Sequence, residues 1–217
     1  FDGTNDDING PPVDTILGVG SSIEAWVYFD DVTTRQTIIS GYDTQPVANL
    51  YRWDFEIKDG VFRGGFHNLG FWTSTTSINT GQWYHVVFVV STVTVRFYLD
   101  GVLDTSQSTQ SAYNLGGPDV NLGIGDRSES SIGHLNGRIG ELRTYDSILS
   151  EEEVFQNYNA NTGKYNTSLI RSIAPKLTTE IPQGFQQVGG TSLKFYVDFG
   201  NRYSYSFAEN RLTLSYK

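Results

Sequence analysis

Apolar and polar residues alternate along most of the first 145 residues, which is the period-two pattern of β-strands with one buried face. In IEAWVYF, residues 23–29, every second residue is apolar and the residues between them form a second face. In RWDFEI, residues 52–57, the same alternation predicts that Trp53, Phe55 and Ile57 face a core. The pattern therefore predicts a fold built mainly from half-buried strands.

Two Asp-Gly pairs predict tight turns between strands. Asp59–Gly60 and Asp100–Gly101 each follow an alternating run, which is typical of a two-residue β-hairpin loop. Between them, residues 82–91 are apolar on both faces and predict a central strand covered on both sides. About ten short strands separated by turns predict an all-β fold, in which two antiparallel sheets pack as a β-sandwich of the jelly-roll type.

One short helix is predicted, over residues 150–160. Ser150 and Glu153 have the spacing of a capping box, and three glutamates lie in the first turn, where the helix dipole favours them. Gly163 is expected to end the helix. The residues expected to pack it onto the sandwich are Val154, Phe155 and Tyr158.

The regular alternation is lost after residue 164. Residues 166–190 contain two prolines and a glycine pair and predict an extended connector, after which two alternating stretches predict further strands. We therefore predict a sandwich domain over residues 1–164, followed over residues 165–217 by the connector and a small β appendage. A three-stranded piece of this size is marginal alone, so we expect it to pack on the sandwich or to pair with other chains of a larger assembly.

The order of several segments resembles that of a known family. The chain contains, in order, FDGTNDDI, SIEAWVYF, QTIISGYD, TGQWYHVVFVV, VRFYLDGVL, NLGIGDRS and LNGRIGELRTYDSILSEEEVFQNYNA. Over residues 1–164 this order resembles a laminin-G-like domain of the concanavalin-A-like lectin and glucanase superfamily. The ending NYNANTGKY is similar to the version of this module in tailed-phage virion proteins. The resemblance implies two antiparallel sheets face to face, binding of glycans or proteins, and often a structural Ca²⁺.

Two acids on one predicted strand raise the question of catalysis. Asp54 and Glu56 lie two residues apart, so a strand places both carboxylates on one face, as in the acid and nucleophile of some glycosidases. A glucanase relative would carry three acids at alternate positions, whereas here Arg52 and Lys58 stand at the ends of the row. These cations would keep both carboxylates ionised, whereas an acid catalyst needs a raised pKa. We expect a solvated strand face and no enzyme, with a glycoside hydrolase that uses Asp54 and Glu56 as the alternative.

Oxygen donors of the kind that Ca²⁺ prefers cluster at the N-terminus. Asp2, Asn5 and Asp6 are the predicted metal ligands, and a solvated acidic turn is the alternative. Gly140 stands where the family often has an aspartate, so one ligand that the resemblance would supply is missing. The three histidines are too far apart in sequence to form a metal-ligand spacing, and His85 is expected in the core.

Aromatic residues near loops are the candidates for ligand binding, because sugars are held by stacking on flat rings and by a few polar groups. The segment GGFHNLGFW, residues 64–72, combines glycines with rings and an amide. The alternative is that the rings fill the core, which is the role expected of Trp53. The predicted ligand-binding residues are Trp72, Phe71, Asn68, His67 and Tyr42.

The composition narrows the classes of partner. The net charge of −9 repels phosphate backbones, so no nucleic acid is expected as a partner, and no apolar run reaches the roughly 18 residues of a membrane span. The sequence has no Cys and no Met, which fits an exposed extracellular or virion surface, and Phe1 is expected not to be the translation start. The expected function is that of a non-enzymatic surface binding, adhesion or decoration module that recognises a glycan or protein on a cell or virion surface, with a purely structural role in a virion or other assembly as the alternative.

Overall fold

The computed structural model describes residues 1–13, 19–43, 53–67, 70–109, 120–126 and 133–165, together with three short strands between residues 193 and 216. The chain divides into two compact units, Phe1–Asn166 and Thr167–Lys217, and each is described by itself.

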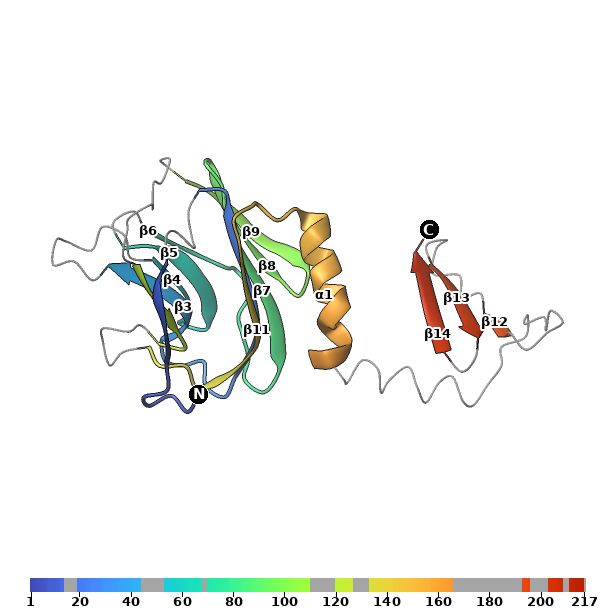
Figure 1. The fold of residues 1–217 in the computed structure, drawn as a ribbon, viewed down its shortest axis with the longest axis horizontal. Helices are drawn as coiled ribbons and strands as arrows, with labels where there is room; N and C mark the ends of the chain where they lie inside the picture. Colours follow the sequence, from blue (N-terminus) through green and yellow to red (C-terminus); the bar gives the residue numbers. More distant parts are fainter. Residues whose placement is uncertain are drawn as a thin grey trace. The chain divides into compact units, whose positions relative to one another are not determined.

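The first unit is a sandwich of two antiparallel sheets, as predicted (Figure 1). The strands of one sheet are β1 (Ile8–Val13), β3 (Gln36–Asp43), β4 (Trp53–Lys58), β5 (Val61–Phe66), β6 (Gly70–Thr73) and β10 (Val120–Ile124). The strands of the other sheet are β2 (Ser21–Phe29), β7 (Trp83–Val90), β8 (Thr94–Leu99), β9 (Val102–Ser108) and β11 (Gly137–Tyr145). Their orders are β1-β10-β3-β4-β5-β6 in the six-stranded sheet and β11-β2-β7-β8-β9 in the five-stranded sheet.

The inward faces of both sheets share one apolar core. Phe55 and Ile57 of β4 and Ile23 and Val27 of β2 are fully buried, and the ring of Phe55 stacks on Phe88 of β7 with centroids 5.7 Å apart. Each such side chain contributes roughly 1.5–3 kcal/mol through its removal from water. The predicted period-two alternation is therefore confirmed, and it fixes which face of each strand points away from the core.

Both predicted Asp-Gly turns are present. Asp59 and Gly60 have φ of 53° and 74°, and Asp100 and Gly101 have φ of 49° and 80°, so all four residues occupy the left-handed region that a two-residue hairpin turn requires. Gly101 has a second reason to lack a side chain, because a Cβ there would lie 2.8 Å from the Tyr158 ring.

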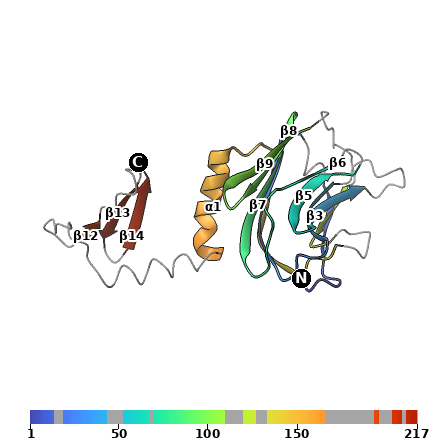
Figure 2. The same ribbon diagram turned by 180° about the vertical axis from the view of Figure 1, so that it is seen from behind.

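Helix α1 (Glu151–Tyr165) lies against the five-stranded sheet on the side away from the core (Figures 1 and 2). Its capping box is confirmed, because Ser150 N donates to Glu153 Oε2 at 2.8 Å and Glu153 N donates to Ser150 Oγ at 3.2 Å. Val154 is buried against Val87 and Val89 of β7. The central strand β7 is therefore covered on both faces, as its sequence predicts.

Two predictions about this helix are wrong. Phe155 is 47% exposed rather than docked, because the sheet-facing stripe of the helix runs through Val154 and Tyr158 instead. Gly163 does not end the helix, which continues to Tyr165. The Tyr165 ring is buried against two tryptophans, with centroid distances of 4.6 Å to Trp26 and 4.8 Å to Trp83. No helix among the described residues is long and apolar enough to cross a membrane.

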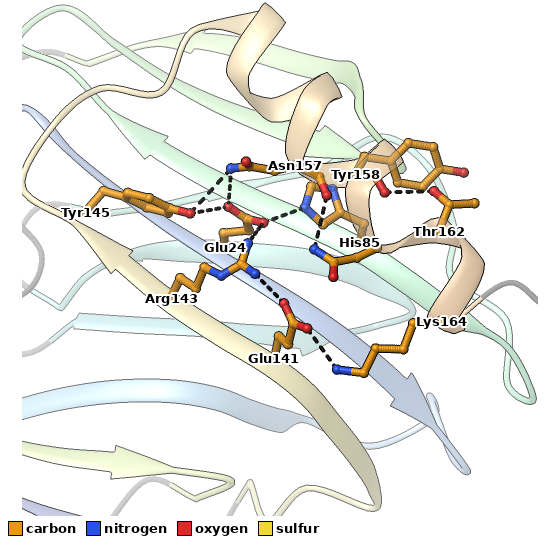
Figure 3. A network of polar contacts seen from close by, with 10 residues as sticks. Glu24, His85, Glu141, Arg143, Tyr145, Asn157, Tyr158, Thr162 and Lys164 are labelled. Atoms are coloured by element: carbon orange, nitrogen blue, oxygen red, sulfur yellow. Dashed lines mark hydrogen bonds and ion pairs between the residues drawn. The ribbon is translucent and has the colours of Figure 1, made fainter. Parts of the chain in front are cut away.

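Polar side chains fill the space between α1 and the sheet around the buried carboxylate of Glu24 (Figure 3). Tyr145 and Asn157 donate to Glu24 Oε2 at 2.7 Å and 2.8 Å, while Arg143 Nη1 and His85 Nε2 lie 3.1 Å from Oε1. Burial alone would raise the pKa of Glu24, but these hydrogen bonds and the charges of His85 and Arg143 lower it below its ordinary value of 4.5. His85 is fully buried, as expected, although it lies between sheet and helix rather than between the two sheets.

The second unit contains a three-stranded antiparallel sheet in the order β12 (Leu193–Phe195), β13 (Tyr203–Ala208) and β14 (Arg211–Tyr216). This sheet is the predicted C-terminal β appendage. The predicted boundary after residue 164 stays a prediction about which part of the chain folds alone.

The docking of α1 can be tested at Gly140, where β11 shifts register and where a Cβ would lie 2.3 Å from Tyr165 Cε1. We expect Gly140→Ala to lower the free energy of unfolding by about 1–3 kcal/mol, because the added methyl group displaces the Tyr165 ring. In a Tyr165→Ala background the same substitution should have little effect, since the clash is gone. Urea unfolding of the two single variants and the double variant measures this coupling, and additive effects would contradict the proposed packing.

Candidate ligand-binding site

The face of β4, β5 and β6 that points away from the core carries a group of charged and aromatic residues. Because Phe55 and Ile57 face the core, Asp54 and Glu56 of β4 must lie on the other face. Glu56 pairs in register with Arg63 of β5. Asp54 and Phe71, from β4 and β6, both pair with Gly65 of β5. A Cβ at Gly65 would lie 2.4 Å from Gly70 O and 2.7 Å from Phe71 Cα, so the glycine allows β6 to approach closely.

The prediction that Asp54 and Glu56 lie on a solvated face is wrong. Asp54 is 2% exposed and Glu56 is fully buried, because arginine side chains cover them. Arg35 Nη2 lies 3.0 Å from Asp54 Oδ2, and Arg35 Nε donates to Glu56 Oε2 at 2.5 Å. Arg63 makes an ion pair with the other oxygen of Glu56. The acids are therefore held by ion pairs rather than by water.

Sequence reasoning missed both of these arginines. Arg63 could have been found, since a two-residue turn at Asp59–Gly60 places residue 63 opposite residue 56. Arg35 precedes β3, and β3 shifts register against β4 between Thr37 and Ile39, so counting from a turn could not have found it. Of the two cations that the sequence did indicate, Lys58 is half-buried at the end of β4 and Arg52 lies outside the described residues.

Two of the predicted ligand-binding residues join the arginines and acids. His67 Nε2 lies 3.0 Å from Asp54 Oδ2, and the rings of His67 and Phe71 meet edge to face with centroids 5.4 Å apart. The guanidinium of Arg63 lies 4.2 Å from the centroid of the Phe71 ring. We call this set the outer-face cluster. Its members are Arg35, Asp54, Glu56, Arg63, His67 and Phe71.

The other predicted ligand-binding residues lie elsewhere or beyond the described part. Trp72 packs against the core, because it pairs with the core-facing Gly64 and so lies on the face opposite to Phe71. Tyr42 lies in β3 and pairs with Asn121, but its side chain is not among those described. Asn68 lies outside the described residues.

The cluster is layered by charge. The side chains of Arg35, Arg63 and His67 are 20%, 16% and 23% exposed, while the two carboxylates beneath them are buried. Burial and the neighbouring charge of Asp54 raise the pKa of Glu56 above its ordinary value of 4.5, and the charges of the two arginines oppose this rise. The surface thus offers guanidinium and imidazole edges beside an aromatic ring.

The N-terminal acids accept backbone hydrogen bonds within their own turn. Asp6 Oδ2 accepts a hydrogen bond from Asp2 N at 3.0 Å, and Asp2 Oδ1 accepts one from Thr4 N at 2.9 Å, so both carboxylates close the local turn. Among the described residues no group of three or more His, Cys, Asp or Glu is placed to hold a metal ion. A calcium site at Asp2, Asn5 and Asp6 stays a prediction.

The burial of the acids predicts a stability effect that a solvated face would not give. We expect Glu56→Ala to lower the free energy of unfolding by about 3–5 kcal/mol, because Arg35 and Arg63 would lose their shared acceptor. As the control, Glu152→Ala removes an exposed acid from α1 and should change stability by less than about 0.5 kcal/mol. Equal small effects in urea unfolding would show that Glu56 is solvated after all.

Comparison with solved structures finds the same sandwich in several proteins. Domain 4 of AbnA, a GH43 extracellular arabinanase from Geobacillus stearothermophilus, solved with arabinotriose, is 23% identical over 72% of this chain and 73% of its own, with a TM-score of 0.55. The Limulus polyphemus SAP-like pentraxin is 16% identical over 69% and 73%, with a TM-score of 0.55. The Ruminococcus gnavus IT-sialidase CBM40, bound to α2,3 sialyllactose, is 10% identical over 70% and 98%, with a TM-score of 0.56. At these identities the likeness shows the fold alone.

Sequence comparison identifies the family. No curated protein matches the chain. The laminin-G-type family model of the concanavalin A-like lectin/glucanases superfamily matches residues 2–155, which is most of the sandwich. The chain belongs to the concanavalin A-like lectin/glucanases superfamily, as its sequence predicts.

Proposed function

We propose that the protein is a non-catalytic module that binds glycan through its outer-face cluster. The observation that carries this proposal is that Arg35 and Arg63, anchored on buried carboxylates, present guanidinium edges next to His67 and Phe71 on one partly exposed face. The extracellular or virion surface that the composition suggests is the setting that we propose for it.

The physical basis of the proposal is preorganisation. A guanidinium has five N–H donors in a fixed plane, and ion pairs to Asp54 and Glu56 hold both arginines in place before any ligand arrives. Sugar hydroxyl oxygens accept hydrogen bonds from such donors, and the apolar face of a sugar ring packs on an aromatic ring such as Phe71. Since the side chains are already ordered, binding loses less conformational entropy.

The fold relatives support the same class of ligand. Two of the similar domains were solved with a bound oligosaccharide, one with arabinotriose and the other with α2,3 sialyllactose. This support concerns the fold and the ligand class.

A glycoside hydrolase is the second candidate, and the raised pKa of Glu56 is the observation that favours it. Against it, both carboxylate oxygens of Glu56 accept hydrogen bonds from guanidinium groups, so they are not placed to donate a proton or to attack a sugar. Asp54, the only partner acid on the strand, is likewise held by Arg35 and His67. We therefore propose binding without turnover.

Binding through the cluster can be tested with a glycan array and calorimetry on purified protein. We expect Phe71→Ala to weaken binding of the captured glycan about tenfold, or ~1.4 kcal/mol, because the ring that packs on the sugar is lost. Phe155→Ala removes an exposed ring from α1 and serves as the control that should leave affinity unchanged. The incubated glycan should remain intact, and turnover that Glu56→Gln abolishes would contradict a non-catalytic role.

We also propose that residues 165–217 join the protein to other chains of an assembly, and the strand register of the appendage favours this. Tyr205 of β13 pairs with Leu214 of β14, whereas the neighbouring Ser206 pairs with Thr213. Apolar positions therefore share one face of the sheet and small polar positions share the other. A three-stranded sheet cannot bury such a face by itself. The positions on the apolar face are Leu193, Phe195, Tyr203, Tyr205, Phe207, Leu212, Leu214 and Tyr216.

Truncation tests this assembly role. The truncation should follow Asn166 rather than Lys164, because the Tyr165 ring is buried against Trp26. We expect residues 1–166 to stay folded and monomeric, while the full chain self-associates in sedimentation velocity experiments.

Two full-length variants provide the matched test of the face. Leu214→Glu should abolish self-association, whereas Thr213→Glu, on the other face of the same strand, should not. Unfolding of the truncated chain would show that residues 167–217 belong to the core, and association of the truncated chain would place the interface on the sandwich.

A further inference from the structure

We infer that the outer-face cluster selects neutral glycans and discriminates against anionic ones such as sialylated or uronic acid sugars. This inference rests on the proposed glycan-binding function and adds to it the charge class of the ligand.

The arginines of the described cluster are paired with its carboxylates. Arg35 is paired with both Asp54 and Glu56, and Arg63 is paired with Glu56. Lys58 follows on the same face at the end of β4, but among the described residues no ion pair joins it to these acids. With Lys58 and His67 set aside, two guanidinium groups balance two carboxylates. The described cluster therefore holds no arginine in excess that could neutralise a carboxylate on the ligand.

Releasing an arginine of the cluster to a charged ligand costs free energy. The Nε–Nη2 edge of Arg63 faces the fully buried carboxylate of Glu56, so a ligand carboxylate could take that edge only by displacing Glu56. Displacement would leave Oε1 of Glu56 without its guanidinium partner away from water, with Arg35 on Oε2 as the remaining partner, and this loss costs free energy. The attraction between Arg63 and the ligand would be offset by this loss.

The net charge of the whole chain also acts on an approaching ligand. The whole chain carries a net charge of −9, so an anionic sugar is repelled as it approaches. A neutral sugar meets no such barrier, and its hydroxyl oxygens need only the outward N–H edges of Arg35 and Arg63, which remain partly exposed. The ring of Phe71 beside them suits the apolar face of a neutral pyranose or furanose.

Matched pairs of ligands test the inference on the full chain. Calorimetry should compare lactose with α2,3 sialyllactose, and fully methyl-esterified tri-galacturonic acid with its free acid, because each pair differs in negative charge. We expect the neutral member of any pair that binds, and of the array hits in general, to bind at least about tenfold more tightly. Its affinity should change less than about twofold between ~0.05 M and ~0.5 M NaCl, since no net charge is neutralised on binding.

A charge variant gives the complementary test. Glu56→Gln keeps the shape of the side chain but leaves the two arginines with one uncompensated charge, so it should shift the preference towards the anionic member of a pair by about tenfold. Asp54→Asn should shift it in the same direction and provides a second variant if Glu56→Gln does not fold, as judged by circular dichroism.

The outcomes separate the inference from the proposed function. Tighter binding of the anionic members by the unaltered chain, or strong weakening by salt, would overturn the inference and leave glycan binding intact. Binding of no glycan on the array or in either pair would overturn the proposed function and the inference together.

Discussion

The apolar core shared by the two sheets is the constraint on which the rest of the molecule depends. Phe55 and Val27 are buried between the sheets, and because side chains alternate along a strand, their neighbours must lie on the opposite face of each sheet. That opposite face can therefore have a different role. On the five-stranded sheet that second face is covered by α1. On the six-stranded sheet, around β4, β5 and β6, it carries the outer-face cluster.

On both outer faces a buried glutamate is held by arginine. Under α1, Glu24 contacts His85 and Arg143, and one further hydrogen bond, from Asn157 of the helix, links the helix to the sheet (Figure 3). In the outer-face cluster Glu56 is held by two arginines, but no described helix lies over them, and their edges reach the surface. Exposure of the donors does not distinguish the two arrangements, because the Arg143 side chain is 40% exposed against 20% and 16% for Arg35 and Arg63; the helix that supplies Asn157 to the first arrangement does.

Much of the fold, but less of the site, could be predicted from the sequence. Alternation, the Asp-Gly turns and the capping box are local signals, and the structure confirms them. The approach of Arg35 to Glu56 involves a register shift in β3, and no local pattern in the sequence indicates this shift. The prediction that Gly163 ends the helix is wrong because burial of the Tyr165 ring outweighs the cost of a glycine inside a helix, which is about 1 kcal/mol. The Tyr165 ring also explains why Gly140 departs from the family pattern, because a Cβ at residue 140 would clash with that ring.

The central claim is that ligand binds at the outer-face cluster, and NMR of the arginine side chains tests it most directly. The Nε–Hε signals of Arg35 and Arg63 should be followed during titration with a neutral oligosaccharide captured on the array. We predict saturable shifts of both signals together with the ring signals of Phe71, while Arg143 beneath α1 stays unchanged. Saturable shifts at Arg143 or elsewhere, with Arg35 and Arg63 unaffected, would contradict the account.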